Sequence, residues 1–336
     1  MTPLTTSTEQ LPQRLRRRAE ASWQTLVSRQ ELIVWMLLML VSSFLALRTE
    51  TFLDSGNLSN IARTFSWIAI AAFGESLVII IGGIDLSVGA VMALAGMICA
   101  LAMQAGLPIP VAVVCGLLTG STIGLINGLL VGRFNLQPFI VTLGTMSVAR
   151  GVALSLTDGE PIRTLPAEFR ALGQADPTPF GIPLPTIIML ITWGIMTLLL
   201  GRTVLGRYIF TLGSNSRALA MAGVDTPRVK VLVYTLCGLI TSLAGLVMTA
   251  RVGVAAPTAA IGYELDIIAA AVIGGISLFG GEGSMTGVML GAALMQVLRN
   301  GLVLLGVPPQ GHAIAIGAMI LVVLLLDYWR RRRVTT

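Results

Sequence analysis

The stretch LGSNSRALAMAGVDTPRVK, residues 212–230, decides how the chain is organised, because it is a polar and basic break between two long apolar runs. One apolar run ends at Leu200 and the next begins at Val231. The Gly-Ser-Asn segment 213–215 combines turn-forming and N-capping residues. The alanine-rich segment that follows favours a short helix, which Gly223 is expected to stop.

This short helix has two interpretations. Its nucleation is costly, so a helix of this length is marginal in water by itself. Ala218, Met221 and Ala222 fall on one face by the three-and-four spacing of a helix. The segment is either an ordinary capped connector between two membrane helices or a docking helix whose small apolar face enters a groove on a partner protein.

The composition defines the class of the whole chain. Apolar residues make up 55 % of the 336 residues and charged residues only 11 %, against about 25 % charged residues in soluble domains. The net charge of +6 is not a nucleic-acid signature, because the basic residues cluster at the ends of apolar runs. The chain is therefore predicted to be a polytopic membrane protein without a nucleic-acid partner. Its three cysteines lie inside apolar runs and are expected to be small buried side chains: Cys99, Cys115 and Cys237.

The apolar runs predict an all-α bundle of about ten membrane spans with both termini in the cytoplasm. The predicted spans are residues 32–47, 61–81, 86–103, 109–131, 139–156, 187–200, 231–250, 265–279, 285–305 and 314–326. The predicted organisation is an N-terminal cytoplasmic arm (1–30), a membrane domain (31–329) with a cytoplasmic loop (202–230), and a basic cytoplasmic tail (330–336). Short segments such as the eighth are also compatible with a re-entrant hairpin.

Two glycine-interrupted segments nearly repeat each other. IGGIDL at residues 81–86 and IGGISL at residues 273–278 are both predicted near the inner face. A pair of such segments in corresponding places of two halves indicates a substrate path in some transporters. An internal repeat and a chance match in a glycine-rich chain are both compatible with this pair.

The motifs that enzymes need are missing from the sequence. Lys230 is the only lysine and follows Val229, so no Walker A loop exists. His312 is the only histidine, which excludes HExxH and multi-histidine metal sites. We therefore expect no catalysis, no cofactor and no metal in this chain. The energy for active transport then comes from an ion gradient or from another subunit.

Ionisable residues inside predicted spans are functional candidates, because each costs about 2.5–3.5 kcal/mol at the centre of a membrane helix. Glu75, Asp85 and Arg150 lie within predicted spans, and Arg299 fits this group less clearly. The two acids are compatible with the cation site of an ion-coupled carrier. They are also compatible with ion pairs to these arginines or with a position at a water-filled end of the bundle, and Asp85 with a cap for the third span.

Uncharged polar residues on the fourth and fifth predicted spans suit hydrogen bonding to a hydroxylated solute, and they suit contacts between helices as well. Together with Asp85 and one aromatic residue they form the predicted translocation path. Its candidate residues are Asp85, Asn127, Gln137, Phe139, Thr142 and Thr145.

Four ordered motifs resemble a known family. GRTVLGRYIFTLGSNSRALAMAGV (201–224) looks like the cytoplasmic loop of permease subunits of bacterial ABC importers for pentoses and related monosaccharides, the ribose permease type. IGGIDLSVGAVMALAG (81–96), QPFIVTLGTMSVARG (137–151) and GYELDIIAAAVIGGISLFGGEGSMTGVMLGA (262–292) are similar to three further signatures of that family. The resemblance covers about residues 55–329 and leaves out the N-terminal arm.

The resemblance implies the function and the partners. A permease of this kind works with an ATPase subunit that binds ATP and Mg²⁺, a periplasmic sugar-binding protein, and a second identical or related permease in the lipid bilayer. The loop then resembles the coupling helix that enters a cleft of the ATPase. The coupling residues carried over are Gly213, Asn215, Arg217, Ala218, Met221 and Gly223. Ser216 and Leu219 stand where acidic or alanine residues are common in this loop, a departure that bears on partner choice.

Three hypotheses follow from the sequence. The first is the permease of an ATP-driven importer for a monosaccharide or a related polyol. The second is an ion-coupled secondary transporter that uses Glu75 or Asp85. The third is a membrane-embedded enzyme, which the missing nucleophile and metal sets disfavour.

Overall fold

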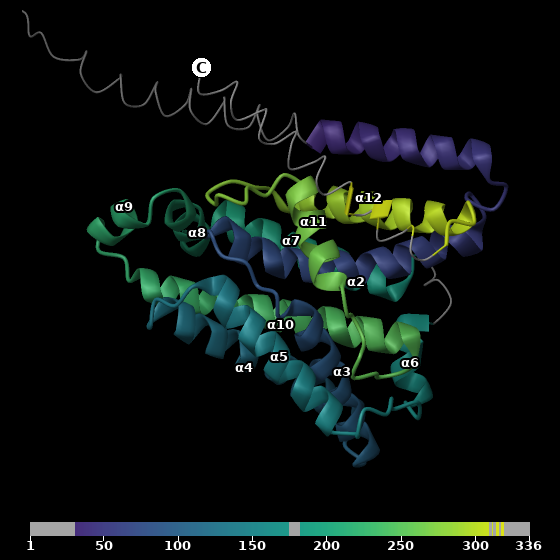
Figure 1. Cartoon of the computed structure of the whole chain (residues 1–336), viewed down its shortest axis with the longest axis horizontal. Coiled ribbons are helices and arrows are strands. Elements are labelled where there is room, and N and C mark those ends of the chain that lie inside the picture. Colours follow the sequence, from purple (N-terminus) through teal and green to yellow (C-terminus); the bar gives the residue numbers. More distant parts are fainter. Residues whose placement is uncertain (1–30, 175–181, 309–310, 312–313, 316, 319–336) are drawn as a thin grey trace, which may run out of the picture.

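A computed structural model describes residues 31–174, 182–308, 311, 314–315 and 317–318 of the chain. These residues form a helical bundle (Figure 1) without a sheet, and an isolated bridge pairs Ile162 with Ala255. After an N-terminal helix, Glu31–Arg48, the helices are α2 Ser55–Ile80, α3 Val88–Gln104, α4 Ile109–Gly132, α5 Pro138–Ser155, α6 Ala167–Gln174, α7 Leu184–Arg202, α8 Val204–Ser214, α9 Ser216–Met221, α10 Thr226–Val252, α11 Tyr263–Ile273 and α12 Met285–Leu304.

The predicted all-α membrane class is confirmed. Within the described part of the chain, seven helices are long and apolar enough to cross a membrane: the N-terminal helix, α2, α4, α5, α7, α10 and α12. The 17-residue α3 is apolar but shorter. Residues 1–30, residues 330–336 and most of the tenth predicted span, 314–326, lie outside the described residues.

The prediction of a full eighth span over 265–279 is wrong. Helix α11 has only 11 residues, whereas about 20 are needed to cross the hydrocarbon core. Gly274 ends the helix, and Gly275 has a left-handed backbone with φ of 100°. The glycines that interrupt the apolar run therefore turn the chain back within the bundle.

Helices α2 and α10 form the centre of the bundle, as their buried fractions show. In the most apolar window of each, 83 % of α2 and 67 % of α10 is buried. Figure 1 shows α12 and the N-terminal helix on one side of this pair, and α3, α4 and α5 on the other. Helix α12 is intermediate, with 56 % of its window buried. The N-terminal helix, α4, α5 and α7 are buried by at most 28 % and face outward.

The packing of α4 on α10 rests on glycines at every fourth residue of α4. This stripe consists of Gly116, Gly120, Gly124, Gly128 and Gly132. A Cβ atom at Gly124 would collide with the carbonyl oxygen of Tyr234, and one at Gly120 would collide with the carbonyl oxygen of Gly238. The two backbones are thus in direct contact, as is common where small residues line a membrane helix interface.

Candidate functional site

The loop 202–230 contains the short helix that the sequence predicts. Helix α9 follows α8 after the single residue Asn215, whose side-chain Oδ1 accepts a hydrogen bond from the Ala218 amide at 3.0 Å. This N-cap satisfies one of the free amides that every helix start presents. Gly223 adopts φ of 82° just after the helix, the left-handed conformation that glycine provides at a helix end. The predicted cap and stop are both confirmed.

Helix α9 protrudes at one end of the molecule (Figure 1) and leaves most of its surface open. Leu219 is the buried residue of the helix and anchors it to the bundle. Met221 is 84 % exposed, and Arg217 and Ala222 are exposed as well, while Ala218 is half-buried. An exposed methionine beside an arginine on a capped helix is a surface suited to a protein partner.

The second candidate region is a polar cluster inside the bundle. Glu75 on α2 and Asp85 in the turn after α2 are both buried. The Asp85 amide donates to Glu75 Oε1 at 3.0 Å. Asp85 Oδ1 accepts from the Ser87 amide at 2.8 Å and from the Ser87 hydroxyl at 2.5 Å. Ser87, and not Asp85, is the N-cap residue of α3. Asp85 supports that cap from two residues earlier.

Two of the predicted path residues join this cluster. Asn127 on α4 donates to Asp85 Oδ2 at 3.4 Å and to the Ser87 hydroxyl at 3.2 Å. Thr142 on α5 donates to the Ile84 carbonyl at 3.2 Å. Both side chains are fully buried within the single chain. They therefore tie α4 and α5 to the turn between α2 and α3, which favours the helix-contact interpretation of these two residues.

Some oxygens of the cluster have hydrogen-bonding capacity to spare. Among the described residues, Glu75 Oε2, Asn127 Oδ1 and the Tyr234 hydroxyl are buried without a protein partner. Tyr234 on α10 was missed from the sequence, because it lies within the apolar run that begins at Val231 and nothing there places it near Glu75 or Asp85. The cluster is polar enough to hold bound water at these atoms.

The other predicted path residues lie apart from the cluster. Gln137 is exposed and precedes α5 without a side-chain cap. Phe139 is 49 % exposed on the outer surface of the chain. The Thr145 hydroxyl bonds to the Val141 carbonyl of its own helix at 3.2 Å. The structure thus divides the six candidates into a buried group and a group at or near the surface of α5.

The arginines take other partners than the two acids of the cluster. Arg150 donates to the carbonyl oxygens of Pro257 and Ala259, each at 2.7 Å. Arg299 pairs with Asp266. The predicted ion pairs from Glu75 or Asp85 to these arginines are therefore wrong, because Arg150 holds the loop between α10 and α11 and Arg299 holds α11.

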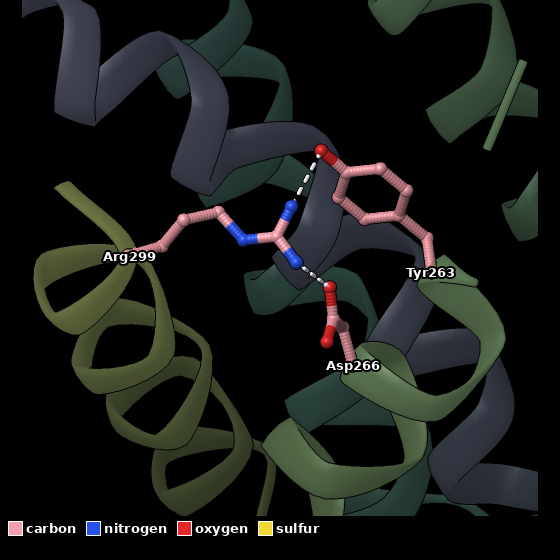
Figure 2. Close-up of polar contacts among 3 residues, drawn as sticks. All are labelled: Tyr263, Asp266 and Arg299. Carbon is pink, nitrogen blue, oxygen red and sulfur yellow. Dashed lines mark hydrogen bonds and ion pairs between the residues drawn. The ribbon is translucent and has the colours of Figure 1, made fainter. Parts of the chain in front are cut away.

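Figure 2 shows how Arg299 on α12 holds the short helix α11. Its guanidinium forms an ion pair with Asp266 and donates to the Tyr263 hydroxyl at 2.9 Å. The guanidinium carbon also lies 4.7 Å from the centre of the Tyr263 ring, a cation–π distance. Tyr263 in turn packs edge-on against Trp67 of α2 at 4.9 Å. These contacts hold α11 between α2 and α12, although α11 is too short to span the membrane.

A bundle of long apolar helices with one exposed, capped helix at its end is the architecture of a multi-pass membrane protein. Residues 57–324 match the family described as branched-chain amino acid transport system / permease component. The chain belongs to this family and is a multi-pass protein of the inner membrane.

Relatives match the chain over nearly its whole length. The ribose import permease protein of Escherichia coli K12 is 40 % identical over 308 residues, which cover 90 % of this chain and 94 % of the relative. That of Bacillus subtilis strain 168 is 39 % identical and covers 89 % and 92 %. The D-allose transport system permease protein of E. coli K12 is 37 % identical and covers 87 % and 90 %. No solved structure matches the chain.

Proposed function

We propose that this chain passes a monosaccharide or related polyol across the inner membrane as the permease subunit of an ATP-driven importer. The family description names branched-chain amino acids, but the similar relatives are named for ribose, allose, fructose and arabinose. Identity of 36–40 % to the ribose, allose and fructose permeases favours the sugar class. A periplasmic binding protein delivers the solute to the permease.

The observation that carries the ATP-driven mechanism is the exposed helix α9. The N-cap at Asn215 and the buried side chain of Leu219 hold this protruding helix in place, and Met221 is exposed on its surface. ATP and Mg²⁺ are bound by a separate ATPase subunit, with no cofactor in this chain. When the ATPase subunits close on ATP, they move α9. The helical bundle then changes conformation, because the ATPase makes different contacts with the two conformations of the permease.

The solute path lies at a contact between two permease copies, identical or related. One exposed face of α5 carries small or hydroxyl residues at spacings of three and four, and Gly144 and Gly151 have open space beside them. These are Gly144, Ser147, Gly151 and Ser155. Small and hydroxyl residues are typical of contacts between membrane helices. Gln137 lies in line with this face at the start of α5, and the nearby Phe139 is also exposed.

The proposal includes about ten membrane segments with both termini in the cytoplasm. The seven long helices are supplemented by α3, by α11 as a partial crossing, and by the segment 314–326. In this topology α9 and the turn before α3 lie on the cytoplasmic side, where the ATPase binds. Basic residues near α9, such as Arg202, Arg207 and Arg217, suit that side.

The docking of α9 is testable by site-specific photo-crosslinking. Met221 is replaced by a photoreactive phenylalanine analogue in membranes that contain the neighbouring ATPase, and Leu107, in the loop between α3 and α4, is replaced as a control. Leu107 is also exposed, at 43 %, but lies in the loop assigned to the opposite side of the membrane. We expect a crosslink to the ATPase from position 221 and none from position 107. Absence of the crosslink at 221 in an assembled complex would rule out docking through α9.

A further inference from the structure

Three backbone segments that are far apart in the sequence meet where α8 leads into α9, within the loop 202–230. They are the end of α2 with the turn after it, the end of α8, and the tip of the loop between α11 and α12. Figure 1 shows this last loop reaching α8. The Gly281 amide donates to the Ile80 carbonyl oxygen at 2.8 Å. We call this meeting point the glycine junction; it consists of Ile80, Gly82, Gly213, Ser214, Gly280 and Gly281.

The glycine junction is a contact of backbone on backbone. A Cβ atom at Gly213 would collide with the Ile80 carbonyl oxygen and would lie 2.5 Å from the Gly281 nitrogen. A Cβ atom at Gly280 would lie 2.9 Å from the same carbonyl oxygen and 3.2 Å from Gly213 Cα. Gly280 and Gly281 both have left-handed backbones, with φ of 82° and 75°. No side chain fits between the three segments, so a shift of one segment must displace the others.

On one side the junction leads directly to α9. Asn215 is the only residue between the end of α8 at Ser214 and the start of α9 at Ser216. The Asn215 amide bonds to the Thr211 carbonyl at 2.8 Å while its side chain caps α9. Asn215 is therefore hydrogen-bonded both to α8 and to α9. A displacement of α9 is expected to move the end of α8, which contains Gly213.

On the other side the junction leads to both glycine-interrupted segments. The turn after Ile80 continues to Ile84, whose carbonyl accepts from Thr142 of α5, and to Asp85, which supports the start of α3. The loop 274–284 is closed by a hydrogen bond from the Ser277 amide to the Glu282 carbonyl at 3.1 Å, and it continues into α12. The junction is thus connected through short turns to the starts of α3 and α12 and, through the Ile84–Thr142 hydrogen bond, to α5.

We infer that the glycine junction passes the movement of α9 to the two glycine-interrupted segments, and that Gly213 is the positioning residue of this step. The inference rests on the proposed function, since it needs an ATPase that moves α9. It gives the surroundings of the near-repeat a mechanical role: Ile80 immediately precedes IGGIDL, Gly281 follows IGGISL in the same loop, and both lie against Gly213. Gly213 acts through these turns and touches neither solute nor nucleotide.

The test compares coupling in proteoliposomes that contain the permease, the ATPase and the binding protein. Gly213→Ala adds a methyl group at the junction. Gly201→Ala is the matched control, because nothing lies within 4 Å of a Cβ atom there. The readout is the number of ATP molecules hydrolysed per solute imported. We expect this ratio to rise at least tenfold in Gly213→Ala and to stay at the wild-type value in Gly201→Ala.

A second pair of variants covers the case in which Gly213→Ala does not fold. Ser214 is exposed, and its Cβ lies 2.8 Å from the position of a Cβ atom on Gly281. Ser214→Leu adds bulk on the exposed side of the junction, whereas Ser214→Ala keeps only the Cβ atom. We expect the ratio to rise in Ser214→Leu and to be normal in Ser214→Ala.

The outcomes separate the inference from the proposed function. A residue with only a structural role would lower hydrolysis and import together, so an unchanged ratio in Ser214→Leu or in folded Gly213→Ala overturns the inference while the importer stands. A wild type that imports solute without the ATPase would remove the proposed function, and the inference with it.

Discussion

Gly124→Leu is expected to abolish the folded permease, because the side chain has no space at the crossing of α4 and α10. A Cβ atom there already collides with the backbone of Tyr234. Overpacking a core costs about 1–3 kcal/mol when side chains can adjust. A backbone neighbour cannot rotate away, so α4 and α10 must separate. We expect the yield of monodisperse protein in detergent to fall at least tenfold.

The matched control for this prediction is Gly194→Leu on α7. Nothing lies within 4 Å of a Cβ atom at Gly194, and leucine favours a helix over glycine by about 1 kcal/mol. We expect the control to match or exceed the wild-type yield in size-exclusion chromatography. Normal yield and normal melting of Gly124→Leu would show that α4 and α10 do not cross at these glycines.

The double change Arg217→Glu and Gly223→Trp is expected to remove stimulation of the ATPase by the binding protein almost completely. Arg217 is exposed on α9, so the change reverses a charge on the docking surface. Gly223 has φ of 82°, which a tryptophan adopts only with strain. The helix end is then displaced and its surface carries the wrong charge. Hydrolysis with and without binding protein, measured in proteoliposomes, checks this expectation.

The control is the conservative pair Arg217→Lys and Gly223→Asn. Lysine keeps the positive charge, and asparagine tolerates the left-handed backbone better than other residues. We expect this pair to keep most of the stimulation. If the disruptive pair is stimulated as strongly as the wild type, the loop is a connector between two membrane helices and not a coupling element.

Locally encoded features could be predicted from the sequence. The apolar runs located seven long helices, and the turn residues near Asn215 and Gly223 located α9 with its cap and stop. These signals depend on neighbours in the chain, so no knowledge of the tertiary structure is needed. The helix at 265–279 is shorter than its apolarity predicts, because the glycine pair at 274–275, which is visible in the sequence, ends it there.

Contacts between distant segments could not be predicted. The four-residue spacing of glycines on α4 is visible in the sequence, but the partner helix is not. Asp85 was singled out, yet its bond to Asn127 depends on how α4 packs against the turn between α2 and α3. The contact of Gly213 with Ile80 and Gly281 joins three motifs that the sequence presents separately.

The most direct test of the proposed function is the energy source of uptake. Proteoliposomes with the permease, its ATPase and its binding protein are loaded with ATP or with a non-hydrolysable analogue, and uptake of labelled ribose, allose, fructose and arabinose is followed with and without ionophores. An ATP-driven importer takes up at least one of these sugars only with ATP and the binding protein, and ionophores do not change the rate. Uptake that persists without ATP and collapses with ionophores would contradict the account and identify an ion-coupled carrier.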